Sequence, residues 1–132
     1  MLTIDHIVLT VEDINKTISF YTDILGMDLV DFTPIGASKP RFALQFGNQK
    51  INIHQAQLPF KPHAKNPTCG SVDICFLSDV SIYFWIETFK KHSIIIEGWG
   101  MWSISFSVFK RSRWKFNRNS KPELNPSNRT II

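Results

Sequence analysis

The feature that most constrains the fold of this chain is an order of predicted elements that occurs twice. Residues 4–11 are rich in β-branched side chains, which predicts a strand. An amphipathic helix follows, with Asp13 as its N-cap and Gly26 at its end. Three more strands are predicted at residues 27–32, 41–46 and 50–54, and a Gly-Asn turn joins the last two. The first half therefore has the order β-α-β-β-β.

The second half begins in the same way. A strand is predicted at residues 71–77, a helix at 80–92 with Asp79 near its cap, and a strand at 94–97; residues 103–109 are compatible with one more. We expect an α+β fold of paired β-α-β-β-β units in one domain, with the second unit incomplete. Its parts are the first unit (1–57), a proline-rich connector (58–70), a partial second unit (71–109) and an irregular basic tail (110–132).

Charge is distributed unevenly along the 132 residues. Residues 1–98 hold 8 Lys or Arg and 10 Asp or Glu, whereas residues 99–132 hold 7 Lys or Arg and one acid, Glu123. A basic tail on a mildly acidic body is typical of proteins that bind nucleic acids or membrane surfaces. Residues 110–115 mix cations with a tryptophan, as nucleic-acid-binding segments do. Nucleic-acid binding by the tail is therefore one alternative function, the weakest of those considered.

Three features of the sequence bear on the cellular location of the protein. No apolar stretch approaches the ~18 residues needed to span a bilayer. The first residues lack the basic segment of a secretory signal. Cys69 and Cys75 are too few for a disulfide scaffold. We therefore expect a cytoplasmic protein with no membrane partner.

Several short motifs carry a family resemblance. Residues 4–11, Ile-Asp-His-Ile-Val-Leu-Thr-Val, and residues 20–27, FYTDILGM, resemble the opening strand and the FYxxxLGM helix end of the vicinal oxygen chelate superfamily. This superfamily includes glyoxalase I, bleomycin-resistance proteins and extradiol dioxygenases. Residues 43–54 and 70–76 resemble one glyoxalase-domain-like subgroup. The resemblance covers about residues 3–97 and implies the same paired-unit fold.

The resemblance also implies a divalent metal ion in a cup formed by two units. His6 matches the first ligand position and His54 the second, and Asp73 falls where many relatives have a histidine. Two imidazoles and a carboxylate suit Zn, Ni, Mn or Fe and leave coordination positions open for substrate oxygens. Judged by the residues alone, a strand histidine such as His6 is more often packed, and Asp73 is equally well explained as a hydrogen-bonded structural residue.

Two classes of function follow from the resemblance, and in the first of them the substrate is a small metal-chelating molecule. The first is a metal-dependent enzyme, a lyase or dioxygenase, in which the metal acts as a Lewis acid. The second is a binding protein that sequesters a small molecule without chemistry, as bleomycin-resistance relatives do. The sequence identifies no catalytic residue. Because relatives pair their units between chains, we also expect a homodimer.

The tail departs from the family pattern, which ends in a glutamate ligand after a DPDGN turn. Glu123 lies between a proline and a leucine and matches nothing in that pattern. Codons permitted for residues 109–122, read one base later, encode LKDPDGNLIEIAN, which restores the ending and its glutamate. We interpret the tail as frame-shifted from near Gly98. Loss of this carboxylate predicts a weakly held metal ion and little or no turnover.

Overall fold

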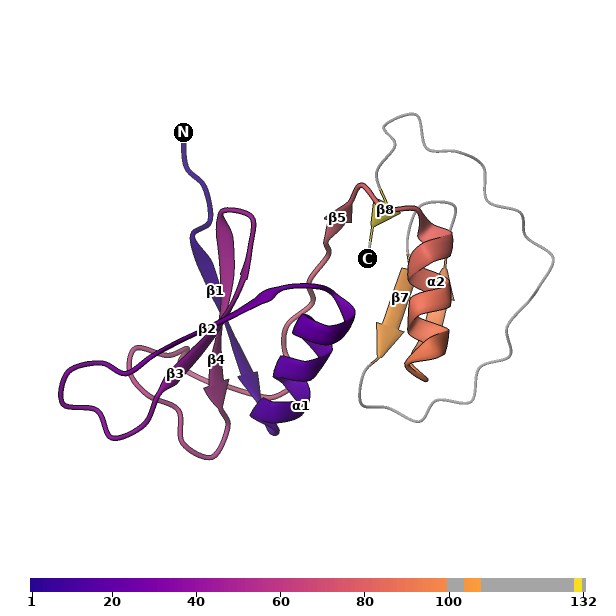
Figure 1. Cartoon of the computed structure of the whole chain (residues 1–132). Coiled ribbons are helices and arrows are strands. Elements are labelled where there is room, and N and C mark those ends of the chain that lie inside the picture. The colour runs from indigo at the N-terminus through magenta and orange to yellow at the C-terminus, as the bar shows by residue number, and fades with distance from the viewer. Residues whose placement is uncertain (100–103, 108–129, 132) are drawn as a thin grey trace. The chain divides into compact units, whose positions relative to one another are not determined.

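The first half of the chain forms a four-stranded mixed sheet in the computed structural model, which describes residues 1–99, 104–107 and 130–131 (Figure 1). The strand order is β1-β4-β3-β2, with β1 parallel to β4 and the other neighbours antiparallel. A helix, α1, lies between β1 and β2 in the chain, so the predicted β-α-β-β-β unit is confirmed. The bounds are β1 His6–Val11, α1 Ile14–Ser19, β2 Asp28–Phe32, β3 Arg41–Phe46 and β4 Gln49–Gln55.

The helix begins where the sequence predicts and changes its geometry part-way. The Asp13 carboxylate accepts a hydrogen bond from the backbone N–H of Lys16 at 3.0 Å, which confirms the N-cap. From Phe20 to Ile24 the chain continues as a π-helical turn, η1, rather than as the regular helix expected from the apolar spacing. Gly26 then adopts a φ of +74°, the left-handed conformation in which a glycine ends a helix.

The two faces of the sheet differ in what covers them. Successive residues of a strand point to opposite faces. On one face, Leu44, Ile51 and Ile53 are buried, and α1, which contacts β4, covers this face. We call the other face the histidine face. On β1 and β4 it is formed by His6, Val8, Thr10, Lys50, Asn52 and His54.

A tight turn sets the register of β4. Gly47 and Asn48 join β3 to β4, and Phe46 pairs with Gln49 across the turn. Gly47 has a φ of +52°, as the first central residue of a type II′ turn requires. The predicted turn is therefore confirmed, and it fixes which residues of β4 lie on the histidine face.

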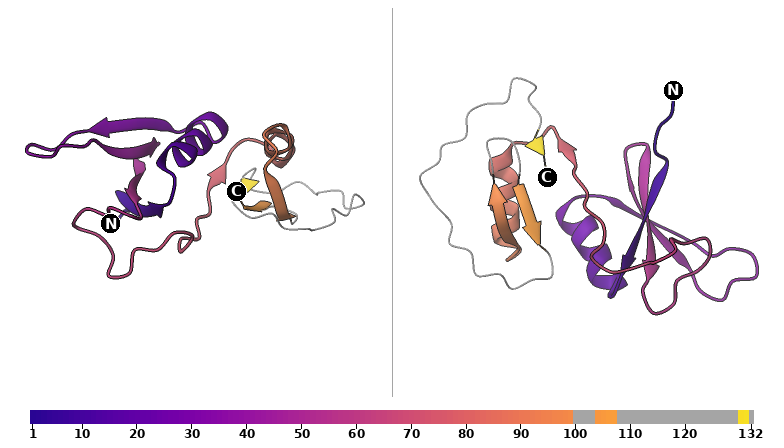
Figure 2. Two further views of the ribbon diagram at one scale, coloured as in Figure 1. Left: turned by 90° about the horizontal axis from the view of Figure 1, so that it is seen from below. Right: turned by 180° about the vertical axis from the view of Figure 1, so that it is seen from behind.

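The second half forms two small sheets and a helix. Ser81 caps α2 (Ile82–Lys91), a role that the sequence suggested for the neighbouring Asp79. The helix contacts β6 (Ile95–Trp99), which pairs with β7 (Ile104–Ser107) (Figure 2). The other small sheet joins β5 (Leu77–Ser78) to β8 (Thr130–Ile131). The predicted helix and the strand near residue 95 are thus confirmed.

Two predictions for this half are corrected. The strand expected at residues 71–77 is reduced to β5, because residues 71–76 have no regular structure and β-branched side chains make a strand only where a partner strand is aligned. Thr130–Ile131 forms a strand although the tail was expected to be irregular throughout. The remainder of the tail, including the residues interpreted as frame-shifted, lies outside the described residues.

Contacts divide the chain into two compact units, Met1–Asp73 and Ile74–Ile132. The boundary lies after Asp73, within the stretch predicted as the start of the second unit (71–109). In the described part of the chain, no helix combines the length and the hydrophobicity that a membrane span requires.

Candidate functional site

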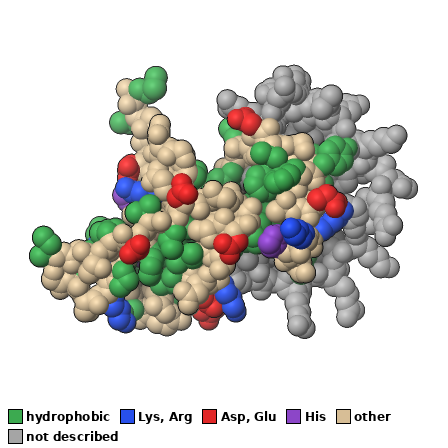
Figure 3. Space-filling view, in the orientation of Figure 1, with side chains coloured by type: hydrophobic (Ala, Val, Ile, Leu, Met, Phe, Trp, Pro, Cys, Tyr) green, Lys and Arg blue, Asp and Glu red, His purple; other side chains and the backbone are tan. Residues whose placement is uncertain are grey.

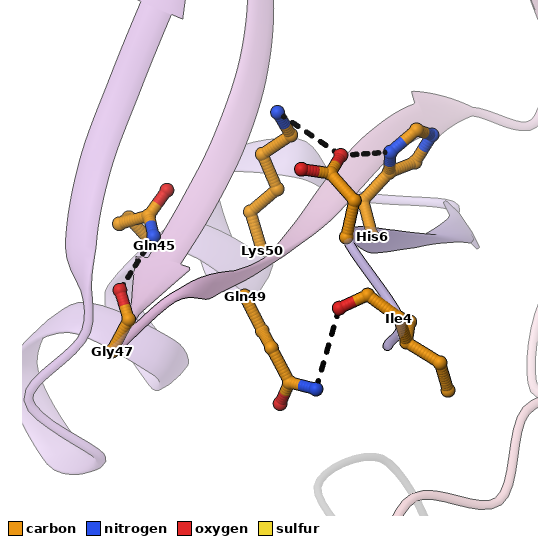
Figure 4. Close-up of polar contacts among 7 residues, drawn as sticks. Ile4, His6, Gln45, Gly47, Gln49 and Lys50 are labelled. Atoms are coloured by element: carbon orange, nitrogen blue, oxygen red, sulfur yellow. Dashed lines mark hydrogen bonds and ion pairs between the residues drawn. The ribbon is translucent and has the colours of Figure 1, made fainter. Parts of the chain in front are cut away.

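A charged cluster lies at the start of β1 on the histidine face (Figure 4). The Asp5 carboxylate oxygen Oδ2 lies 2.7 Å from Nδ1 of His6 and 3.3 Å from Nζ of Lys50. The two partners lie opposite each other in the ladder, because His6 pairs with Lys50 in the parallel register of β1 and β4. One carboxylate oxygen therefore joins an imidazole and an ammonium group from two neighbouring strands.

Backbone and side-chain hydrogen bonds fix the position of this cluster. The Lys50 backbone N–H donates to the Asp5 carbonyl at 3.0 Å, which extends the ladder one residue before β1 begins. The Gln49 side-chain amide donates to the Ile4 carbonyl at 3.4 Å (Figure 4). Asp5 is thus held to β4 through its own backbone and through the preceding residue.

The electrostatics of the cluster keep Asp5 ionised. The hydrogen bond from His6 lowers the pKa of the Asp5 carboxyl, and the hydrogen bond and charge of Lys50 lower it further. The His6 side chain is 43% exposed and that of Asp5 72% exposed, so both groups remain accessible from solvent. Within the described part of the chain, Nδ1 of His6 has the Asp5 carboxylate as its partner, and its other ring nitrogen, Nε2, has no protein partner.

His54 lies in a different environment near the end of β4. Its side chain is 2% exposed, and its Nδ1 has no hydrogen-bond partner among the described residues. Phe60 from the connector packs against the imidazole with ring centroids 3.8 Å apart and the ring planes tilted by 38°, and the Arg41 guanidinium lies 3.9 Å from the centre of the Phe60 ring. Burial lowers the pKa of His54, and the charges of Arg41 and His63 lower it further. The ring is therefore neutral near pH 7.

The register places the two histidines on one face but far apart along it. His6 pairs with Lys50, whereas His54 pairs with Thr10, four residues further along β1. Four residues of strand span about 13 Å, and strand side chains stand nearly perpendicular to the sheet. Two nitrogens on one zinc ion lie at most about 4 Å apart, because each Zn–N bond is about 2.1 Å. Within one chain, this register does not bring His6 and His54 to a common ion.

Asp73, the third predicted ligand, is exposed and lies in a stretch without regular structure at the end of the first unit. Among the described residues, no three His, Cys, Asp or Glu side chains are gathered closely enough to hold a metal ion. Asn52 lies between the two histidines on the same face, paired with Val8 and half-buried.

Comparison with known proteins identifies the family of this chain. Residues 3–115 match the model of the Glyoxalase/Bleomycin resistance protein/Dioxygenase superfamily. The chain belongs to this superfamily. The glyoxalase-superfamily chain is 45% identical over 96 residues to virulence protein STM3117 of Salmonella typhimurium, a stretch that covers 72% of this chain and 63% of that protein. It is 43% identical over 97 residues to the glyoxalase domain-containing protein RDO1 of Mycosarcoma maydis, over 73% of this chain and 52% of that one. The chain thus spans less than two thirds of both relatives.

Solved structures give the same assignment. The crystal structure of STM3117 matches with a TM-score of 0.66 and 42% identity over 74% of each chain. An integron cassette protein of Vibrio cholerae matches with a TM-score of 0.66 and 39% identity, over 74% of this chain and 73% of that one. Lactoylglutathione lyase of Agrobacterium tumefaciens, at 23% identity and a TM-score of 0.55 over 76% and 77% of the two chains, shares the fold.

Sequence reasoning about this glyoxalase-superfamily chain missed three residues on or beside the histidine face. Asp5 directly precedes His6, and that adjacency was the available signal. Lys50 and Asn52 become neighbours of the β1 residues only through the parallel register. This register cannot be read from a single sequence, because it depends on how two strands 44 residues apart align.

Proposed function

We propose that this chain acts on or binds a small molecule with adjacent oxygen atoms on the histidine face, with a divalent metal ion held at His6. One observation carries the proposal: His6 is an accessible imidazole with one ring nitrogen bound to a carboxylate and the other without a protein partner in the described residues. A metal-ligating histidine is characteristically held through its second nitrogen in this way.

The residues fit part of the metal hypothesis. His6 supplies a neutral nitrogen ligand of the kind that Zn, Ni, Mn and Fe accept. Because His6 and His54 lie far apart along the strands, the other ligands of an ion at His6 must be groups other than His54. We propose the oxygens of the bound molecule, with Asp73 and the Asn52 amide as further candidates. When bound, the metal would supply Lewis-acid polarisation of a substrate oxygen.

The chain's own residues have separate roles in this proposal. His6 binds the ion, and Lys50 presents a positive charge beside it that attracts an anionic oxygen of the small molecule. Arg41, Phe60 and His54 form a packed wall at the other end of the face. With one firm nitrogen ligand and no family glutamate, we expect weak metal binding and a low rate of any lyase or dioxygenase reaction.

Calorimetry with Zn²⁺ and Ni²⁺ on the full chain tests the metal site. His6→Ala is expected to abolish measurable binding. His92→Ala removes an exposed histidine at the end of α2 and serves as the matched control, which is expected to bind like the unmodified chain. Equal binding by the His6→Ala variant and the unmodified chain would overturn the assignment of the ion to His6.

A second candidate function is non-catalytic binding of a small molecule on the same face. The separation of His6 from His54 favours it, because a face lined by dispersed polar groups suits recognition by hydrogen bonds. Acetohydroxamate, a small chelator with two adjacent oxygens, distinguishes the two functions. The metal-dependent function predicts that it binds only with Zn²⁺ present, whereas the metal-free function predicts the same affinity in EDTA.

We also propose that the chain works as a cytoplasmic homodimer. Every residue of the edge strand β2 is exposed, including Leu29, Val30 and Phe32. Apolar side chains of the first unit are exposed on the face seen in Figure 3. An exposed apolar edge strand is a surface that proteins ordinarily cover, and a second copy of the chain would cover it.

A further inference from the structure

The carboxylate of Asp5 lies on the histidine face, although strand alternation would place it on the opposite face. Asp5 directly precedes His6, so its side chain would point to the face opposite His6 if the strand simply continued. Its Oδ2 atom instead contacts Nδ1 of His6 and Nζ of Lys50, which both belong to the histidine face (Figure 4). Asp5 lies one residue before β1 begins, so the alternation of that strand does not fix the direction of its side chain.

This contact determines which nitrogen of His6 carries the proton. An ionised carboxylate only accepts hydrogen bonds, so the 2.7 Å contact requires a proton on Nδ1. In the neutral ring, Nε2 is then the unprotonated nitrogen, and its lone pair is available to bind a metal ion or accept a hydrogen bond. Nε2 has no protein partner among the described residues. A histidine in water favours the opposite tautomer, with the proton on Nε2, so the contact selects the form that is less common in solution.

We propose that Asp5 is a positioning residue for His6, fixing the tautomer that presents the electron pair of Nε2 to the bound partner. Lys50 supports this role, because its ammonium group contacts the same Oδ2 atom and its backbone N–H holds the Asp5 carbonyl. The identity of the group that binds Nε2, a metal ion or a ligand hydroxyl, rests on the proposed function. The assignment of the tautomer is independent of that function.

The tautomer can be read directly from the ¹⁵N chemical shifts of the His6 ring in the full chain at a pH where the ring is neutral. The unmodified chain is expected to show the Nδ1–H form. Asp5→Ala removes the acceptor and is expected to return His6 to mainly Nε2–H, whereas Asp5→Asn keeps an amide oxygen and is expected to retain part of the Nδ1–H population. Asp31→Asn, which removes an exposed carboxylate from β2, is the matched control and is expected to leave His6 unchanged.

Zn²⁺ affinity provides the second readout. Loss of a group that orients a metal-binding histidine typically costs about 10- to 100-fold in affinity, so Asp5→Ala is expected to weaken binding by that factor while Asp31→Asn does not. An unmodified chain with His6 in the Nε2–H form, or an Asp5→Ala variant that keeps the Nδ1–H form, would overturn the positioning role. An Nδ1–H form that depends on Asp5 in a chain that binds no Zn²⁺ would confirm the positioning role and overturn the metal function separately.

Discussion

Replacing His54 with leucine is expected to leave the fold as stable as before or to make it more stable. The ring is 2% exposed and its Nδ1 has no partner among the described residues. Burying an unsatisfied polar atom costs about 1–3 kcal/mol, and leucine removes that cost at similar volume. The variant loses the ring contact with Phe60, and such aromatic pairs contribute about 0.5–1.5 kcal/mol. The net expectation at pH 7.5 is a gain of about 1 kcal/mol in the free energy of unfolding.

The same residue predicts how stability depends on pH. Burial, with the charges of Arg41 and His63, lowers the pKa of His54 in the folded chain below its ordinary value of 6.5. Between these two pKa values the unfolded chain binds more protons, so stability rises with pH there. The contribution is fully present above about pH 6.5 and is lost as pH falls toward the folded pKa. One such group accounts for at most about 1.4 kcal/mol between pH 7.5 and pH 5.5.

Urea unfolding at both pH values measures these effects. The advantage of His54→Leu over the unmodified chain is expected to grow on going from pH 7.5 to pH 5.5. His6→Leu changes an exposed imidazole and is the control, expected to alter stability by about 0.5 kcal/mol or less. A His54→Leu variant less stable than the unmodified chain by more than about 1 kcal/mol at both pH values would show that Nδ1 is satisfied in the folded protein, contrary to this reasoning.

Three further predictions concern the core, the sheet edge and the tail. Leu44→Ala removes a fully buried side chain and is expected to cost about 2–5 kcal/mol of stability in thermal unfolding, with a cost below about 1 kcal/mol counting against the assigned core. Val30→Lys places a charge on the exposed edge strand β2 and is expected to convert a dimer into a monomer in sedimentation, whereas an unmodified chain that is already monomeric would contradict the dimer. A chain with its reading frame restored after Gly98, so that it ends in the glutamate-bearing strand, is expected to bind Zn²⁺ more tightly than the present chain, and equal affinities would refute the loss of a ligand.

The parts of the fold that could be predicted are those determined by local sequence. The Asp13 cap, the Gly47 turn and the strand at residues 41–46 each follow from a few adjacent residues, and the structure confirms them. Residues 71–76 carry the apolar and β-branched side chains expected of a strand, yet the described structure assigns them to no strand. Strand formation there depends on a distant partner, which no local pattern encodes.

The candidate site was predicted less completely for a related reason. His6 and His54 were correctly assigned to strands, and the structure places both on one face. Their spacing along that face depends on the β1–β4 register, which the sequence does not state. Asp5 was overlooked because side chains of adjacent strand residues ordinarily point apart.

The position of the metal ion is the central claim, and ¹⁵N spectra of both strand histidines during a Zn²⁺ titration test it most directly. His6 is expected to show a large shift at Nε2 with Nδ1 still protonated, while the buried ring of His54 is expected to stay unchanged. A titration in which His54 responds and His6 does not, or in which neither ring responds, would contradict the account.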